Sequence, residues 1–206
     1  MDYKLYIWAY FMIMIDNEYG VAGLMGNLYA ESGLIPNKVQ NIPSASSDSD
    51  AYTQAVDDGT KTEYEFVHDS VGYGLAQWTY YTRKQALYDM YKSGGYSTIG
   101  SIELQCEYLA YELEHGYPSV LEALKNATSV REASDYVLHN FEQPANQSTA
   151  VEIKRANYGI KIYNEMTGTG TELPEVKPEV TAKKKKFKFL LMTANKRRLT
   201  WKSRNF

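Results

Sequence analysis

The sequence predicts an α+β fold that is mainly α, with a small β wing, followed by a linker and a basic tail. Apolar residues recur at helical spacing through most of the first 166 residues, as is typical of packed amphipathic helices. Residues 33–74 interrupt this pattern with prolines, a Ser/Asp run and scattered β-formers. We interpret this segment as an irregular wing that would accommodate a short hairpin.

The charge of the chain is divided between two different parts. Residues 1–168 hold 11 Lys/Arg and 22 Asp/Glu, a net charge of −11. Residues 169–206 hold 11 Lys/Arg and 3 Asp/Glu, a net charge of +8. We therefore expect one domain over residues 1–166, a linker over 167–182 and a basic tail over 183–206.

Two helices are expected at the start of the chain. Residues 3–15 are apolar nearly all round, which predicts a buried helix. No clear signal peptide is predicted, because Asp2 opens the chain and no small-residue cleavage site follows. A second helix is expected over about 21–30. Three glycines recur every third residue on one side of it: Gly20, Gly23 and Gly26. Because each glycine costs a helix about 1 kcal/mol, we expect another backbone to pack very close.

Helical patterns resume after the wing. Five further helices are expected, namely at 82–91, after Ser101, at 118–125, after Ser129 and after Ser148. The single cysteine, Cys106, rules out an internal disulfide framework. The acidic charge of the main domain argues against nucleic acid as its partner, and no stretch reaches the ~20 apolar residues of a membrane span. No cofactor is predicted.

Glu31 is the first candidate for chemistry. It lies where the second helix is expected to end, near the negative end of the helix dipole and between apolar neighbours. Both effects favour the protonated carboxyl. A protonated carboxyl is what glycosidic cleavage requires, because the leaving oxygen must receive a proton.

The second candidate is the segment GYGLAQW at residues 72–78, which we name the GYGLAQW turn. Its glycines allow a ligand to approach the backbone, and Gln77 can donate to and accept from a sugar. Substrate-binding residues are predicted in and after this turn: Tyr73, Gly74, Gln77, Trp78, Tyr80 and Tyr81. Of these, Trp78, Tyr80 and Tyr81 would supply stacking faces.

Together these segments resemble the goose-type lysozyme and soluble lytic transglycosylase superfamily, and most closely its phage tail-tip lysozyme family. The resemblance rests on Glu31-Ser32-Gly33 and on GLAQW at residues 74–78, and it covers about residues 5–165. It implies a lysozyme-like fold with a small β wing. It also implies cleavage of the β-1,4 bond between N-acetylmuramic acid and N-acetylglucosamine.

The resemblance carries over unevenly to individual residues. Glu31 matches the catalytic acid of the family, and Gly74, Gln77 and Trp78 match its groove motif. The superfamily often has no fixed nucleophile, so a second carboxylate is less clear. Asp69, just before the GYGLAQW turn, is our candidate for activating water or stabilising the oxocarbenium-like charge.

Three interpretations of the function stay open: a muramidase, a lytic transglycosylase giving 1,6-anhydro products, and a non-catalytic wall-binding or phage tail module. A cysteine peptidase using Cys106 is disfavoured, because Glu103 and Glu107 would raise the thiol pKa. The histidines lack the spacing of a zinc site, so no metal is predicted.

The expected partners follow from the resemblance. They are peptidoglycan glycan strands and, in a tail, other phage or mobile-element proteins. The basic tail at 183–206 is interpreted as the start of a truncated second module, as an arm for anionic wall polymers, or as read-through. The expected location is the cell wall or the virion.

Overall fold

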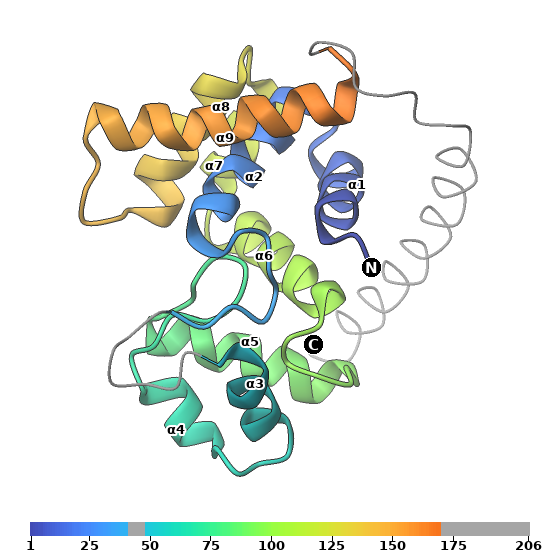
Figure 1. The fold of residues 1–206 in the computed structure, drawn as a ribbon, viewed down its shortest axis with the longest axis vertical. Helices are drawn as coiled ribbons and strands as arrows, with labels where there is room; N and C mark the ends of the chain where they lie inside the picture. The colour runs from blue at the N-terminus through green and yellow to red at the C-terminus, as the bar shows by residue number, and fades with distance from the viewer. Residues whose placement is uncertain (41–47, 170–206) are drawn as a thin grey trace. The chain divides into compact units, whose positions relative to one another are not determined.

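The computed structural model describes residues 1–40 and 48–169, and within these residues it is built from helices and connecting turns (Figure 1). The helices are α1 (Tyr3–Ile15), α2 (Glu18–Ser32), α3 (Ser49–Asp57), α4 (Glu63–His68), α5 (Tyr81–Gly94), α6 (Ile102–His115), α7 (Pro118–Asn126), α8 (Val130–Val137) and α9 (Thr149–Thr167). A π-helical turn, η1 (Leu138–Glu142), follows α8. The two opening helices and the five later ones are present, although most extend beyond the predicted ends.

The chain divides into two compact units. The terminal unit comprises Met1–Asn27 and the described residues from Leu113 onward, whereas the central unit is Leu28–Glu112. The predicted linker at 167–182 lies almost entirely outside the described residues, and the basic tail at 183–206 lies wholly outside them. Within the described ranges, no helix is both long enough and apolar enough to cross a bilayer.

The glycines of α2 allow three helices of the terminal unit to approach it closely. A Cβ at Gly20 would lie 2.1 Å from Leu124 O of α7. One at Gly23 would lie 2.7 Å from Ser134 N of α8, and one at Gly26 would lie 2.6 Å from Arg155 O of α9. The close approach predicted from the glycine spacing is therefore confirmed.

A buried polar cluster lies beside these contacts. Asn27 Nδ2 donates to Gly23 O and to Ser134 O, both at 3.0 Å, while Arg155 Nη1 donates to Asn27 Oδ1 at 3.2 Å. Asn27 and Ser134 are fully buried. Because buried polar groups are stable only when they are hydrogen-bonded, these contacts fix α2 against α8 and α9, which pack together in Figure 1.

The predicted β wing is wrong for the residues that the structure describes, which contain helices and two isolated β-bridges in place of strands. The part of residues 33–74 expected to be irregular holds α3 and α4. Asp48, from the Ser/Asp run, caps α3 by accepting from Asp50 N and Ala51 N. Thr62 and Glu65 form a complete capping box on α4. These caps satisfy the free N–H groups of short helices, which explains why a turn-rich sequence folds as helix.

Candidate active site

Glu31 lies in the last turn of α2, where its side chain is half-buried. The helix ends one residue later. Gly33 and Leu34 both adopt the left-handed conformation, with φ values of 66° and 65°. For a leucine this conformation is strained, so the sharp turn after Glu31 has to be stabilised by surrounding structure.

Two short turns carry the chain from α2 to Lys38. Ile35 N donates to Ser32 O, and Lys38 N donates to Ile35 O, both at 3.3 Å. Because a turn of this kind keeps its end Cα atoms within about 7 Å, Ser32 and Lys38 are about 14 Å apart or less. The segment that follows Glu31 is therefore compact.

Lys38 connects this segment to the GYGLAQW turn. Its carbonyl oxygen accepts from Gly74 N at 2.8 Å and from Gln77 Nε2 at 3.0 Å. Two further bonds run from Gln40 N to Gly72 O at 2.8 Å and from Gly72 N to Gln40 Oε1 at 3.0 Å. The Glu-Ser-Gly and Gly-Leu-x-Gln segments are thus joined by hydrogen bonds within the central unit.

The turn itself is closed by Tyr73 and Trp78, whose backbones exchange hydrogen bonds of 3.2 and 2.9 Å. Gly74 has a φ of 82°, and a Cβ there would lie 2.5 Å from Gln105 Oε1. The buried Gln105 accepts from Leu75 N at 2.8 Å. Only glycine satisfies both requirements at position 74.

Gln77 also stabilises the turn. Its φ is 46°, and its Nε2 donates to Lys38 O and Gly74 O, both at 3.0 Å. The donor half of the amide is thereby used within the protein. Any contact with a sugar would have to use Oε1, which can only accept.

Tyr73 and Trp78 are fully buried, so their rings are not available as the stacking faces that the sequence predicted. Tyr73 OH pairs with Thr53 Oγ1 at 2.8 Å, and burial raises the Tyr73 pKa. Trp78 Nε1 donates to Glu112 Oε2 at 2.8 Å. Glu112 also receives Arg83 in a bidentate ion pair at 2.6 and 2.8 Å. These two aromatic residues therefore support the turn from the protein interior.

Tyr80 and Tyr81 follow the turn and are exposed at 63% and 50%. Their ring centroids lie 5.0 Å apart with a tilt of 45°. Of the predicted aromatic contacts, these are the two that are exposed to solvent.

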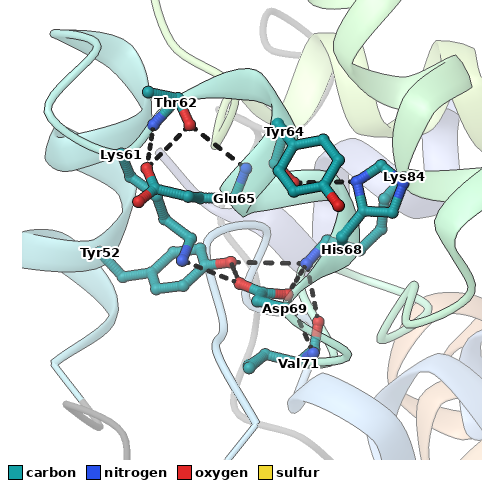
Figure 2. Close-up of polar contacts among 9 residues, drawn as sticks. All are labelled: Tyr52, Lys61, Thr62, Tyr64, Glu65, His68, Asp69, Val71 and Lys84. Carbon is teal, nitrogen blue, oxygen red and sulfur yellow. Dashed lines mark hydrogen bonds and ion pairs between the residues drawn. The ribbon is translucent and has the colours of Figure 1, made fainter.

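Asp69 lies in a cluster of charged and polar groups (Figure 2). Its Oδ1 receives Lys84 Nζ at 2.5 Å and Val71 N at 3.0 Å, while its Oδ2 receives Tyr52 OH at 2.6 Å and lies 3.1 Å from Lys61 Nζ. Burial opposes the charged carboxylate, but the bonds from Lys84, Tyr52 and Val71 N–H hold the Asp69 pKa below its usual value. A carboxylate stabilised in this way is a weak base.

Lys84, on α5, is the buried partner in this cluster. Its side chain has no exposed surface, and Nζ also donates to Val71 O at 3.0 Å. Burial lowers the Lys84 pKa, and Asp69 acts in the opposite direction. The pair therefore anchors the backbone just before the GYGLAQW turn to α5.

A family model described as phage tail lysozyme matches residues 2–166. The chain belongs to the phage tail lysozyme family. No curated protein and no solved structure matched the chain. Membership of the family implies peptidoglycan-degrading activity, suggests a glycoside hydrolase and suggests association with the virion.

Several supporting residues of this phage tail lysozyme domain escaped the sequence analysis, namely Lys84, Gln105 and Glu112. All three are buried polar side chains that hold the turn or the residues before it. Lys84 carried one usable signal: it shares a helical face with the buried Leu87 and Tyr91, where a lysine is out of place without a buried partner.

Two other kinds of site were considered from the sequence, a reactive cysteine and a zinc site. Cys106 is completely buried, and burial, reinforced by Glu103, raises its thiol pKa well above the usual value. Such a thiol is a poor nucleophile. Residues 1–40 and 48–169 contain no group of three or more His, Cys, Asp or Glu placed to hold a metal ion.

Proposed function

We propose that this protein is a muramidase that cleaves the β-1,4 bond between N-acetylmuramic acid and N-acetylglucosamine, with Glu31 as the general acid. The match to the phage tail lysozyme family over residues 2–166 carries this proposal. The position of Glu31 supports it, because the compact segment that follows this residue is hydrogen-bonded to the GYGLAQW turn.

In the proposed reaction, the carboxyl of Glu31 donates its proton to the glycosidic oxygen as the bond to the anomeric carbon breaks. The bonding electrons leave with that oxygen, and positive charge develops on the sugar ring. Water then attacks the anomeric carbon and passes a proton to the solvent, which yields a reducing sugar end, and the Glu31 carboxylate takes up a proton from the solvent for the next cycle. The proposed substrate contacts are Tyr80, Tyr81 and Gln77 Oε1.

The role of Asp69 determines the second candidate function. Asp69 was predicted to activate water or to stabilise the oxocarbenium-like charge, but its carboxylate is bound by two lysines, a tyrosine and a backbone N–H. These contacts favour a structural role. A site without a carboxylate base for water favours attack by the muramic acid 6-hydroxyl, which would make the protein a lytic transglycosylase that leaves 1,6-anhydro ends.

Clearance of a peptidoglycan suspension by the full chain tests the assignment of Glu31. We expect Glu31→Gln to lower the rate by about a hundredfold or more, because general acid catalysis contributes 10²–10⁴-fold. Glu18→Gln is the matched control, since Glu18 lies in the first turn of the same helix and is exposed. Equal clearance by wild type and Glu31→Gln would refute the assignment, and no clearance by wild type would favour a wall-binding module.

Mass spectrometry of the digest separates the two reactions. A muramidase leaves reducing muramic acid ends, whereas a lytic transglycosylase leaves 1,6-anhydro ends. If the digest contains reducing ends and Asp69→Asn clears peptidoglycan at the wild-type rate, a group other than Asp69 must activate the water.

A further inference from the structure

Four exposed aromatic rings form a continuous row on α4, α5 and the residue before α5. The centroids of Tyr64 and His68 are 4.2 Å apart, those of His68 and Tyr81 are 5.9 Å apart, and those of Tyr81 and Tyr80 are 5.0 Å apart. The first two pairs are stacked, with interplanar angles of 25° and 16°. We call these four residues the aromatic row; Figure 2 shows its Tyr64 and His68.

The two ends of the aromatic row are its most open parts. Stacking covers the inner faces, so the free faces belong to Tyr64 and Tyr80, which are exposed at 72% and 63%. Adjacent aromatic side chains are usually buried in the protein interior, so an exposed row of four rings indicates a ligand-binding surface. Tyrosine rings with free hydroxyls suit a ligand that is apolar on its face and polar at its edge.

The rings are held in position before any ligand binds. The capping box of Thr62 and Glu65 fixes the first turn of α4, and Phe66 and Val67 bury the opposite side of this helix. His68 Nδ1 lies 2.9 Å from Tyr64 O. Holding side chains in the bound geometry lowers the entropy cost of binding.

The same hydrogen bond determines what His68 presents to a ligand. The carbonyl oxygen of Tyr64 can only accept, so Nδ1 carries the proton and Nε2 of the neutral ring is an acceptor. Nε2 has no hydrogen-bond partner among the described residues. A sugar hydroxyl or an acetamido N–H that lies along the row would find an acceptor there.

The charges beside the aromatic row favour a neutral ligand. Gln85 Nε2 donates to Glu63 Oε1 at 2.7 Å and to Asp89 Oδ1 at 2.9 Å, which places two carboxylates on the surface shared by α4 and α5. Phosphate-bearing ligands such as nucleic acid would be repelled here, whereas neutral pyranose rings would not.

We propose that the aromatic row is a saccharide-binding surface that holds the N-acetylhexosamine chain of a peptidoglycan strand, with sugar faces stacked on Tyr64 and Tyr80. The choice of this saccharide rests on the proposed function. The row extends the predicted contacts at Tyr80 and Tyr81 onto α4, where Tyr64 and His68 have had no assigned role.

Binding is measured with the full chain carrying Glu31→Gln, so that cleavage does not obscure it. The ligands are a soluble oligomer of β-1,4-linked N-acetylglucosamine and insoluble peptidoglycan. We expect Tyr64→Ala to weaken binding to both about three- to tenfold, the range of aromatic stacking, while Tyr64→Phe retains most of the affinity. Tyr19→Ala is the matched control, since Tyr19 stacks on Tyr163 in the terminal unit, with centroids 5.0 Å apart.

The outcomes separate the two proposals. Weaker oligosaccharide binding by Tyr64→Ala supports the proposal that the aromatic row binds saccharide. If wild type nevertheless fails to clear peptidoglycan, only the proposal of muramidase activity is refuted. Clearance that depends on Glu31 together with unchanged binding in Tyr64→Ala overturns the row and leaves the muramidase intact. Binding of single-stranded DNA that Tyr64→Ala weakens as strongly as it weakens oligosaccharide binding would also overturn it.

Discussion

Replacing either partner of the Asp69–Lys84 pair should destabilise the protein, and the two substitutions should differ. In Asp69→Asn, the buried Lys84 ammonium loses its carboxylate and keeps only uncharged partners: Val71 O at 3.0 Å, Tyr52 OH at 3.4 Å, the ring of Phe66 with its centroid at 4.3 Å, and the amide oxygen of the new asparagine. In Lys84→Met, the Asp69 carboxylate keeps the Lys61 ammonium at 3.1 Å as well as its two neutral donors. The charge left by Asp69→Asn is therefore the less compensated one.

The magnitude follows from the ionisation of Lys84. An uncompensated buried charge costs about 3–5 kcal/mol. The cost at pH 7 has an upper limit, because Lys84 can release its proton and become neutral. Deprotonating a lysine with the ordinary pKa of 10.5 at pH 7 costs 1.36 kcal/mol for each pH unit between the two values, which is about 5 kcal/mol. Lys84→Met removes charged hydrogen bonds and should cost less, about 1.5–3 kcal/mol.

Urea unfolding followed by circular dichroism at pH 7 and pH 9 measures both effects. Without Asp69, the Lys84 pKa falls further, so the unfolded state binds more protons than the folded state. The stability of Asp69→Asn should therefore approach that of wild type as the pH rises. The reasoning is refuted if Lys84→Met is the less stable variant, or if the difference between Asp69→Asn and wild type is the same at both pH values.

Two other substitutions test the terminal unit. Gly23→Ala should lower the free energy of unfolding by about 2 kcal/mol or more, because its Cβ would lie 2.7 Å from Ser134 N. A urea midpoint equal to that of wild type would contradict this expectation. Hydrogen bonds to Gln147 and Glu152 raise the His139 pKa, so its stabilisation is complete below about pH 6.5 and is lost as the pH rises through the folded value. Wild type should therefore exceed His139→Gln in thermal stability more at pH 5 than at pH 8, by no more than about 1 kcal/mol, because the site is largely exposed.

The sequence predicted local features well where the signal was a spacing. The close approach at Gly20, Gly23 and Gly26 followed from their recurrence and from the cost of glycine in a helix. Glu31 was expected where the second helix ends, and α2 ends one residue after it. The wing failed for two reasons. The Ser/Asp run was read as a turn signal although its Asp48 caps α3, and the Thr62–Glu65 capping box of α4 was missed. Helix caps and turns use the same residue types.

The candidate site shows the other limit of the sequence. An aromatic residue beside a glycine turn reads as a stacking face, but the sequence does not determine whether its ring points to solvent or to the core. Tyr73 and Trp78 point inward, whereas Tyr80 and Tyr81 point outward. Lys84 and Asp69 are fifteen residues apart in sequence, and their contact depends on the packing of α4 on α5. No local pattern encodes that packing.

The glycine contacts of α2 also have a consequence for the order of folding during synthesis. Three glycines make the isolated helix weak, and the helices that compensate for them, α7 to α9, are translated about a hundred residues later. The central unit, Leu28–Glu112, is one continuous stretch and is available to fold first. The N-terminal half of α2 therefore reaches its packed state only after the last helices have been synthesised. A nascent chain released before α9 is complete would expose the glycine surface of α2.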